Sequence, residues 1–146
     1  MLYFDTSYLV RLYLDDAGAD LVRSLAEGDD IACSLHGRIE TVAAFHRAHR
    51  EKRLSRVSYL ALLDQFDEDE AAGAFSWLPI AETLPHRIQA IYRKASADLF
   101  LRAADALHLA SAQENGFTAI YSHDERMLAA APLFSLKGKN VLPRGR

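Results

Sequence analysis

Short apolar runs with strand character alternate with helical patterns from one end of the chain to the other. The strand-like runs are residues 2–4, 30–34, 75–80, 118–122 and 141–142. Helical patterns occupy residues 19–27, 84–94, 103–112 and 125–130, and further helices are predicted after Thr6-Ser7, from about Arg38 and after Ser55. This alternation is typical of an α/β fold in which helices cover both faces of a mostly parallel sheet. Because half of the 146 residues are hydrophobic, we expect a single domain over residues 1–146.

Four acidic residues stand at the polar ends of these apolar segments. Asp5 and Asp124 follow predicted strands, whereas Glu40 and Asp105 lie in the first turns of predicted helices. In an open parallel sheet the ligand crevice lies beyond the carboxyl ends of the strands, so all four side chains are expected to meet there. Without bound cations, repulsion should destabilise such a site and raise the pKa of at least one acid. The pattern therefore predicts a metal-ion nuclease site.

Each of these acids also fits a purely structural role. Asp5 can form a turn, Glu40 can lie on the surface, and Asp105 and Asp124 can supply the charge or the cap at a helix start. Asp5 and Asp105, however, lie in apolar or alanine-rich sequence, where an unpaired carboxylate is costly. The set of four therefore favours one common site over four separate roles.

The balance of charge limits the kind of nucleic-acid binding to expect. A net charge of -3 argues against a protein whose whole surface attracts nucleic acid. Basic residues within 47–53 and 137–146 can still guide phosphates to a local acidic site. The acidic segment 67–70 has a helical, solvent-facing context and is not expected to bind a ligand.

Several other classes of protein are excluded or disfavoured. Cys33 is the only cysteine, so an intramolecular disulfide and zinc sites of the Cys-x-x-Cys type are excluded, and its thiol is expected to be buried. The absence of glycine-rich phosphate loops argues against nucleotide hydrolysis and dinucleotide redox chemistry. With neither a secretory signal nor a membrane-length apolar run, the predicted location is cytoplasmic.

The histidines do not form a zinc-protease motif, because no His-Glu-x-x-His pair is present. His108 follows Asp105 by three residues on one predicted helix face. We expect His108 to pack or to donate hydrogen bonds instead of binding metal. His123 is expected to line the cleft without coordinating.

The acidic motifs resemble, in chain order, those of PIN-domain nucleases, and most closely those of VapC-type toxins of bacterial toxin-antitoxin pairs. The matching segments are Tyr3-Phe4-Asp5-Thr6-Ser7, Glu40, the stretch 101–110 with Asp-Ala-Leu-His-Leu-Ala, and Ser122-His123-Asp124. The resemblance implies a three-layer α/β/α fold, divalent-cation-dependent cleavage of RNA and inhibition by a small cognate antitoxin. It also implies that Ser7 and Ser122 support the carboxylates by hydrogen bonding, which suits the orientation of metal ligands.

The predicted mechanism follows from the charge of the site. One or two Mg²⁺ or Mn²⁺ ions held by Asp5, Glu40, Asp105 and Asp124 would activate water for in-line attack on the phosphodiester and stabilise the leaving oxygen. The products would carry a 5′-phosphate and a 3′-hydroxyl. One alternative is a PIN-like module that binds RNA or protein without cutting. A phosphatase of the haloacid-dehalogenase type is disfavoured because it requires Asp-x-Asp, and Ser7 stands at the second position.

Apolar residues on the first helix suggest an interaction surface. Tyr8, Leu12 and Tyr13 are predicted to be exposed beside the helix that carries Phe45. We therefore expect a homodimer and a hydrophobic groove that receives a helix of the antitoxin. The alternative is that these apolar residues complete the core of the protein itself.

Overall fold

The computed structural model, which describes residues 1–143, is built around short parallel strands. The strands are β1 (Leu2–Tyr3), β2 (Ile31–Ser34), β3 (Phe75–Leu78), β4 (Ala119–Tyr121) and β5 (Lys137–Lys139). The first three pair in the order β1-β2-β3, and β4 pairs with β5. A parallel bridge between Phe4 and Tyr121 brings β4 alongside β1. The resulting strand order is 3-2-1-4-5. Strands β2 and β3 lie on one side of β1, and β4 and β5 lie on the other, so the strand order reverses between β1 and β4.

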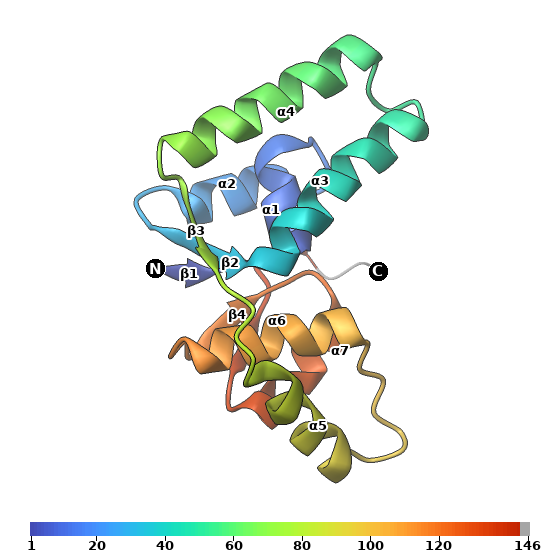
Figure 1. Ribbon diagram of the computed structural model, residues 1–146. Helices are drawn as coiled ribbons and strands as arrows, with labels where there is room; N and C mark the ends of the chain where they lie inside the picture. Colours follow the sequence, from blue (N-terminus) through green and yellow to red (C-terminus); the bar gives the residue numbers. More distant parts are fainter. Residues whose placement is uncertain (144–146) are drawn as a thin grey trace.

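Helices cover both faces of these strands (Figure 1). Above the sheet in Figure 1 lie α1 (Thr6–Tyr13), α2 (Ala19–Ala26), α3 (Leu35–Arg50) and α4 (Arg56–Ala71). Below it lie α5 (Leu84–Lys94), α6 (Ala103–Glu114) and α7 (Glu125–Ala130), which continues into a 3₁₀ turn at Ala131–Phe134. The predicted three-layer α/β/α architecture is therefore confirmed.

Two helices begin earlier than the sequence suggested. The N-cap of α1 is Asp5, whose carboxylate accepts from the backbone N–H of Tyr8, and not the predicted Thr6-Ser7 pair. Helix α3 begins at Leu35, instead of near Arg38, because the Ser34 hydroxyl accepts from the backbone N–H of Gly37. In both cases a short oxygen-bearing side chain satisfies a free N–H group directly after a strand.

The prediction of a last edge strand at 141–142 is wrong. The strand that pairs with β4 is Lys137–Lys139, whose side chains are all exposed. Leu142 is instead buried in the core with Tyr8 and Val22, beside Gly18. The apolar character of residues 141–142 indicated burial and not strand pairing. Strand β5 is held by backbone hydrogen bonds and has no apolar pattern by which the sequence could reveal it.

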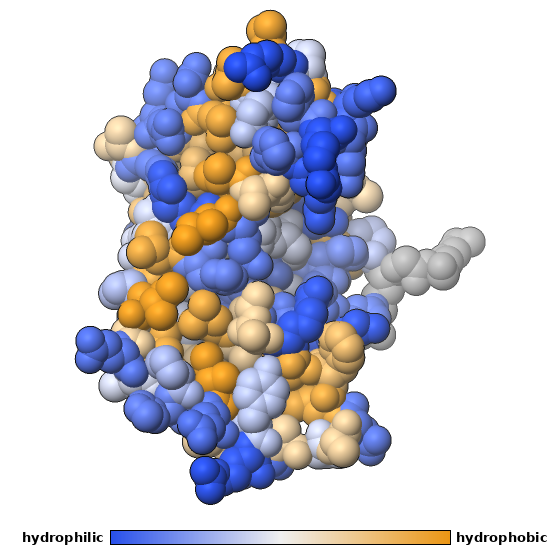
Figure 2. Space-filling view, turned by 45° about the vertical axis from the view of Figure 1, so that its right-hand side comes forward, coloured by the Kyte–Doolittle hydropathy of each residue, from blue (hydrophilic) through white to orange (hydrophobic). Residues whose placement is uncertain are grey.

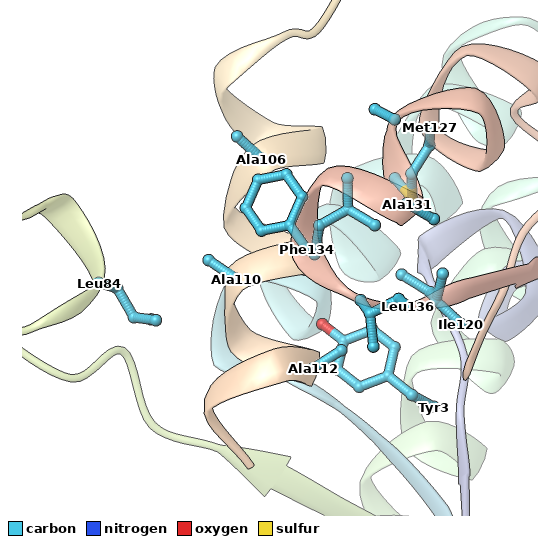
Figure 3. Close-up of a cluster of buried hydrophobic side chains, with 12 residues drawn as sticks. Tyr3, Leu84, Ala106, Ala110, Ala112, Ile120, Met127, Ala131, Phe134 and Leu136 are labelled. Carbon is cyan, nitrogen blue, oxygen red and sulfur yellow. The ribbon is translucent and has the colours of Figure 1, made fainter. Parts of the chain in front are cut away.

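The largest buried cluster lies between the sheet and the helices below it (Figure 3). Tyr3 of β1 and Ile120 of β4 pack there against alanines of α6 and against Phe134. Small side chains at Ala106 and Ala110 allow α6 to approach the strands closely. This packing fixes the start of α6 beside the ends of β1 and β4.

A second region of core corrects the predicted interaction surface on α1. Tyr8 is fully buried, as is Phe45, while Leu12 and Tyr13 are partly buried. The Tyr13 ring lies edge-on to Phe45 and Phe66, and its hydroxyl donates to Asp69 at 2.6 Å. Tyr13 and Phe45 complete the core between α1, α3 and α4, whereas Tyr8 and Leu12 pack in the core between α1, α2 and the sheet. These residues therefore do not form an exposed groove. Within residues 1–143, no helix combines the length and the apolar character that a membrane crossing requires.

Candidate active site

Asp5 lies in the protein interior at the carboxyl end of β1. Ser7 Oγ donates to Asp5 Oδ1 at 2.6 Å, Ser122 Oγ donates to Oδ2 at 2.5 Å, and the Tyr8 N–H donates to Oδ1 at 3.1 Å. Burial raises the pKa of Asp5, and the charge of His108 and these hydrogen bonds partly offset the increase. The two serines named in the sequence therefore both contact this carboxylate.

Asp124 follows β4 on the other side of the switch in strand order. Its Oδ1 accepts from the backbone N–H groups of Arg126 and Met127, so the residue caps α7. Ser122 Oγ accepts from the Asp124 N–H at 2.9 Å while donating to Asp5. A single hydroxyl thus links the two strand-end acids.

Asp105 lies in the first turn of α6 and is buried. The Arg102 guanidinium donates to it twice, from Nε to Oδ2 at 2.8 Å and from Nη2 to Oδ1 at 3.3 Å. Arg102 Nη2 also lies 2.5 Å from Asp124 Oδ2. Arg102, which the sequence analysis did not single out, therefore bridges two of the predicted acids. The available signal was a basic residue three positions before an acid at a helix start.

Glu40 projects from α3 and is held by two groups from other elements. Thr6 Oγ1 donates to Glu40 Oε2 at 2.6 Å, and His108 Nε2 lies 2.7 Å from the same oxygen. His36 Nε2 lies 3.5 Å from Oε1. Burial disfavours the charged form, but the hydrogen bonds and the charges of the two histidines lower the pKa of Glu40 to about 2. His108 thus forms the hydrogen bond that the sequence suggested, whereas Thr6 was missed although it lies next to Asp5.

All four predicted acids line a single cleft of about 350 Å³. Arginine side chains from three elements line it as well: Arg11, Arg47 and Arg102. The side chain of His123, expected at this cleft, does not line it; only its backbone N–H reaches the area, where it donates to Ser7.

The chemistry of the site fits a hard divalent cation, although the side chains already have partners. Its donors are carboxylate oxygens, which Mg²⁺ and Mn²⁺ prefer. The guanidinium of Arg102 lies against Asp105 and Asp124, showing that a positive charge is accommodated between them. Within residues 1–143, however, no three His, Cys, Asp or Glu side chains are already arranged as a metal site. Metal binding would therefore require rearrangement of side chains.

Comparison with known families identifies the fold. The PIN domain model matches residues 2–132. The chain belongs to the PIN domain family. The switch in strand order in this PIN domain lies between β1 and β4, where Asp5 and Asp124 stand. None of the curated proteins matches the sequence.

Solved structures with the same fold come from toxin-antitoxin systems. VapC20 from Mycobacterium tuberculosis, described as a Sarcin-Ricin loop cleaving toxin, is 17% identical with a TM-score of 0.68 over 89% of this chain and 95% of its own. VapBC2 from Rickettsia felis, bound to a promoter DNA fragment, is 14% identical with a TM-score of 0.65, covering 96% and 98%. A toxin-antitoxin complex from Klebsiella pneumoniae is 22% identical with a TM-score of 0.60, covering 91% and 94%. At these identities the likeness shows a shared fold.

Proposed function

We propose that this PIN domain is a metal-dependent endoribonuclease and acts as the toxin of a toxin-antitoxin pair in the cytoplasm. The observation that carries the proposal is the convergence of four acids, from four separate segments, on one cleft with arginines in its lining. Asp5 and Asp105 are buried there, which is costly for carboxylates that serve only the fold. The description of VapC20 as a Sarcin-Ricin loop cleaving toxin supports RNA as the substrate.

In the proposed reaction, Asp5, Glu40, Asp105 and Asp124 hold Mg²⁺ or Mn²⁺. When bound, the ion supplies charge neutralisation at the phosphate and lowers the pKa of an attacking water. Ser7 and Ser122 orient Asp5, and Thr6 and His108 orient Glu40, through the hydrogen bonds described above. These groups would act as positioning residues, since they contact carboxylates instead of the substrate.

The end of α3 offers a path for the RNA backbone. A second hollow, of about 460 Å³, is lined by Glu40 and Thr6 and continues along α3 to Arg47 and Arg50. Figure 2 shows hydrophilic side chains gathered on the upper right of the molecule, with apolar side chains at its top. Arg47 and Arg50 are both exposed. We infer that they contact phosphates, which would position the scissile bond without reading its sequence.

Single substitutions of the buried acids test the activity. Asp5→Asn and Asp105→Asn should each lower Mn²⁺-dependent cleavage of an RNA substrate by ~10² or more, the order expected for loss of a charge stabiliser. Asp67→Asn is the matched control, because this exposed acid on α4 lies outside the cleft. Cleavage by Asp5→Asn or Asp105→Asn at near wild-type rate, with contaminating nuclease excluded, would refute the assignment.

The second candidate is a PIN-like module that binds RNA or protein without cutting it. Arg102 favours it, because this side chain already occupies the oxygens of Asp105 that a metal would need. The same experiment separates the two functions. A wild-type protein that retains RNA but releases no product with Mg²⁺ or Mn²⁺ supports the non-cutting module.

We further propose a homodimer and an antitoxin partner. The similar structures from Rickettsia felis and Klebsiella pneumoniae are toxin-antitoxin assemblies. Since Tyr8 and Phe45 are buried, the dimer surface is assigned instead to Leu35 and Ile39, which are one turn apart on α3 and 42% and 61% exposed.

Light scattering at tens of micromolar tests the dimer. Ile39→Glu should yield monomers, whereas Val57→Glu, at an exposed apolar position on α4, should leave the dimer intact. A wild-type monomer at this concentration would refute the dimer. The candidate antitoxin is the product of a short reading frame for a small DNA-binding protein immediately upstream. Co-purification of that product with this protein tests the partnership.

A further inference from the structure

The carboxylate of Asp105 depends on a single side chain for its hydrogen bonds. Both of its oxygens accept from the Arg102 guanidinium, and among the hydrogen bonds of residues 1–143 no other donor reaches them. The Asp105 side chain is only 6% exposed, so water provides little compensation. A buried carboxylate in this setting requires a cation beside it. Arg102 now fills that requirement.

Asp124 divides its two oxygens between different tasks. Oδ1 caps α7 by accepting two backbone N–H groups, and Oδ2 faces Arg102 Nη2. The oxygen that remains for a metal ion is therefore the one that the guanidinium contacts. The Arg102 side chain is itself 55% exposed, so it has room to turn outward without unfolding α6.

We propose that Arg102 is a built-in competitor of the metal ion: its guanidinium neutralises Asp105 and Asp124 in the metal-free protein and is displaced when a divalent cation binds. The proposal rests on the proposed function, since it concerns the same four acids. It adds Arg102, which is not one of the four acids, and it adds control of the metal affinity by this side chain.

Competition follows from geometry and charge. A forked guanidinium engages both oxygens of Asp105 in a bidentate pair, so it takes one acceptor position on each oxygen and fills the space that a metal ion bridging them would need. A guanidinium and a divalent ion within a few ångströms also repel each other strongly. Contact of the Arg102 guanidinium with the acids therefore weakens binding of the metal ion, and binding of the metal ion weakens that contact. Arg102 thereby neutralises the two acids in the metal-free protein, and the metal affinity is set below what four acids alone would give.

Calorimetric titration of Mn²⁺ into the metal-free protein tests the competition. Arg102→Gln should bind Mn²⁺ more tightly, with a dissociation constant lowered by about tenfold, the order expected for removal of one neighbouring positive charge. The matched control is Arg126→Gln. Arg126 is also an exposed arginine close in sequence to Asp124, but its guanidinium lies 3.9 Å from the centroid of the Phe100 ring, and the residue does not line the cleft. The control should bind within about twofold of wild type, because its charge does not occupy the site.

A second measurement works on the wild-type protein and does not depend on the folding of any variant. In the arginine side-chain NMR spectrum, Mg²⁺ should shift the Arg102 Nε–H signal and accelerate its exchange with water, while the Arg126 signal stays in place. An unchanged Arg102 signal at saturating Mg²⁺, or an Arg102→Gln affinity equal to or weaker than wild type, would overturn the proposal. Failure of wild type to bind Mg²⁺ or Mn²⁺ at all would instead overturn the proposed metal-dependent function.

Discussion

His108 Nε2 lies 2.7 Å from Glu40 Oε2, so a buried imidazole on α6 forms an ion pair with a carboxylate on α3. Burial opposes protonation of His108, but Tyr3, Cys33 and Glu40 around it raise its pKa well above the usual value. Tyr3 supports the ring from the other side, with its hydroxyl 3.0 Å from Nδ1. The pair connects the sheet, α6 and α3 at the base of the cleft.

This pair predicts a specific dependence of stability on pH in metal-free protein. The folded pKa of His108 is raised, so its contribution is complete below the unfolded value of ~6.5 and is lost as pH rises through the folded pKa. The folded pKa of Glu40 is lowered to about 2, so its contribution is present above the unfolded value and is lost as pH falls toward 2. We would measure the free energy of unfolding of wild type and Glu40→Gln between pH 3 and 9 in chelator. Wild type should be the more stable of the two, and its advantage should shrink toward both ends of this pH range. A constant difference would contradict the ion pair.

Gly37 is predicted to be intolerant of even one methyl group. A Cβ at this position would overlap Cys33 Sγ and lie 2.8 Å from His108 Cε1. We expect Gly37→Ala to reduce the free energy of unfolding by ~1–3 kcal/mol, the usual range for an overpacked core. Cys33→Ala removes the nearer atom, so the double variant should recover part of the loss relative to the two single variants. If the two losses simply add in the double variant, the added methyl group is accommodated by a shift of the backbone, and the Cys33 sulfur is not the cause of the loss.

Ser122 and Ser111 provide a matched pair of buried hydroxyls. Ser122→Ala removes the donor to Asp5 and the acceptor for the Asp124 N–H, so we expect a loss of about 1–3 kcal/mol in unfolding free energy together with slower cleavage. Ser111 is equally buried, but its hydroxyl has no hydrogen-bond partner within the described residues. Ser111→Ala should therefore be neutral or stabilising. Equal losses from both changes, measured by urea unfolding, would argue against a role for the Asp5 contact.

Metal ions should stabilise the protein through Asp105. Mn²⁺ at a hundred times its dissociation constant should add ~2.7 kcal/mol to the stability of wild type, visible as a higher melting temperature. Asp105→Asn should lose most of this response, whereas Asp67→Asn should keep it. In chelator, Asp105→Asn should be less stable by at most about 1 kcal/mol, because the Arg102 partner is more than half exposed. Equal metal responses in wild type and Asp105→Asn would show that Asp105 is no ligand.

The sequence predicted the architecture because its signals are local. Apolar runs and helical spacing found the strands and helices, and the bounds of α5 were predicted without error at Leu84 and Lys94. The convergence of the acids followed from the general rule for parallel sheets. A raised pKa of at least one acid was predicted from repulsion, whereas burial is what raises the pKa of Asp5. The counter-charge of Arg102 becomes visible only once its fork lies between Asp105 and Asp124.

Other details were out of reach for a related reason. Burial of Tyr8 depends on long-range packing, and its hydroxyl donates to Asn140 near the far end of the chain. The edge strand β5 is recognised by its register with β4 and not by its side chains. Asp5 both caps α1 and lines the cleft. The sequence motif around it does not reveal which of these two roles it serves.

The order of the strands has a consequence for synthesis of the protein. Asp5 and Glu40 emerge early from the ribosome, but the neighbours that complete the cleft follow much later: Asp105 with the start of α6, and Asp124 after β4. A nascent chain that stops before β4 lacks the strand that flanks β1 on its second side. The complete set of four carboxylates therefore arises late in translation, so an unfinished copy of the chain lacks the complete cleft.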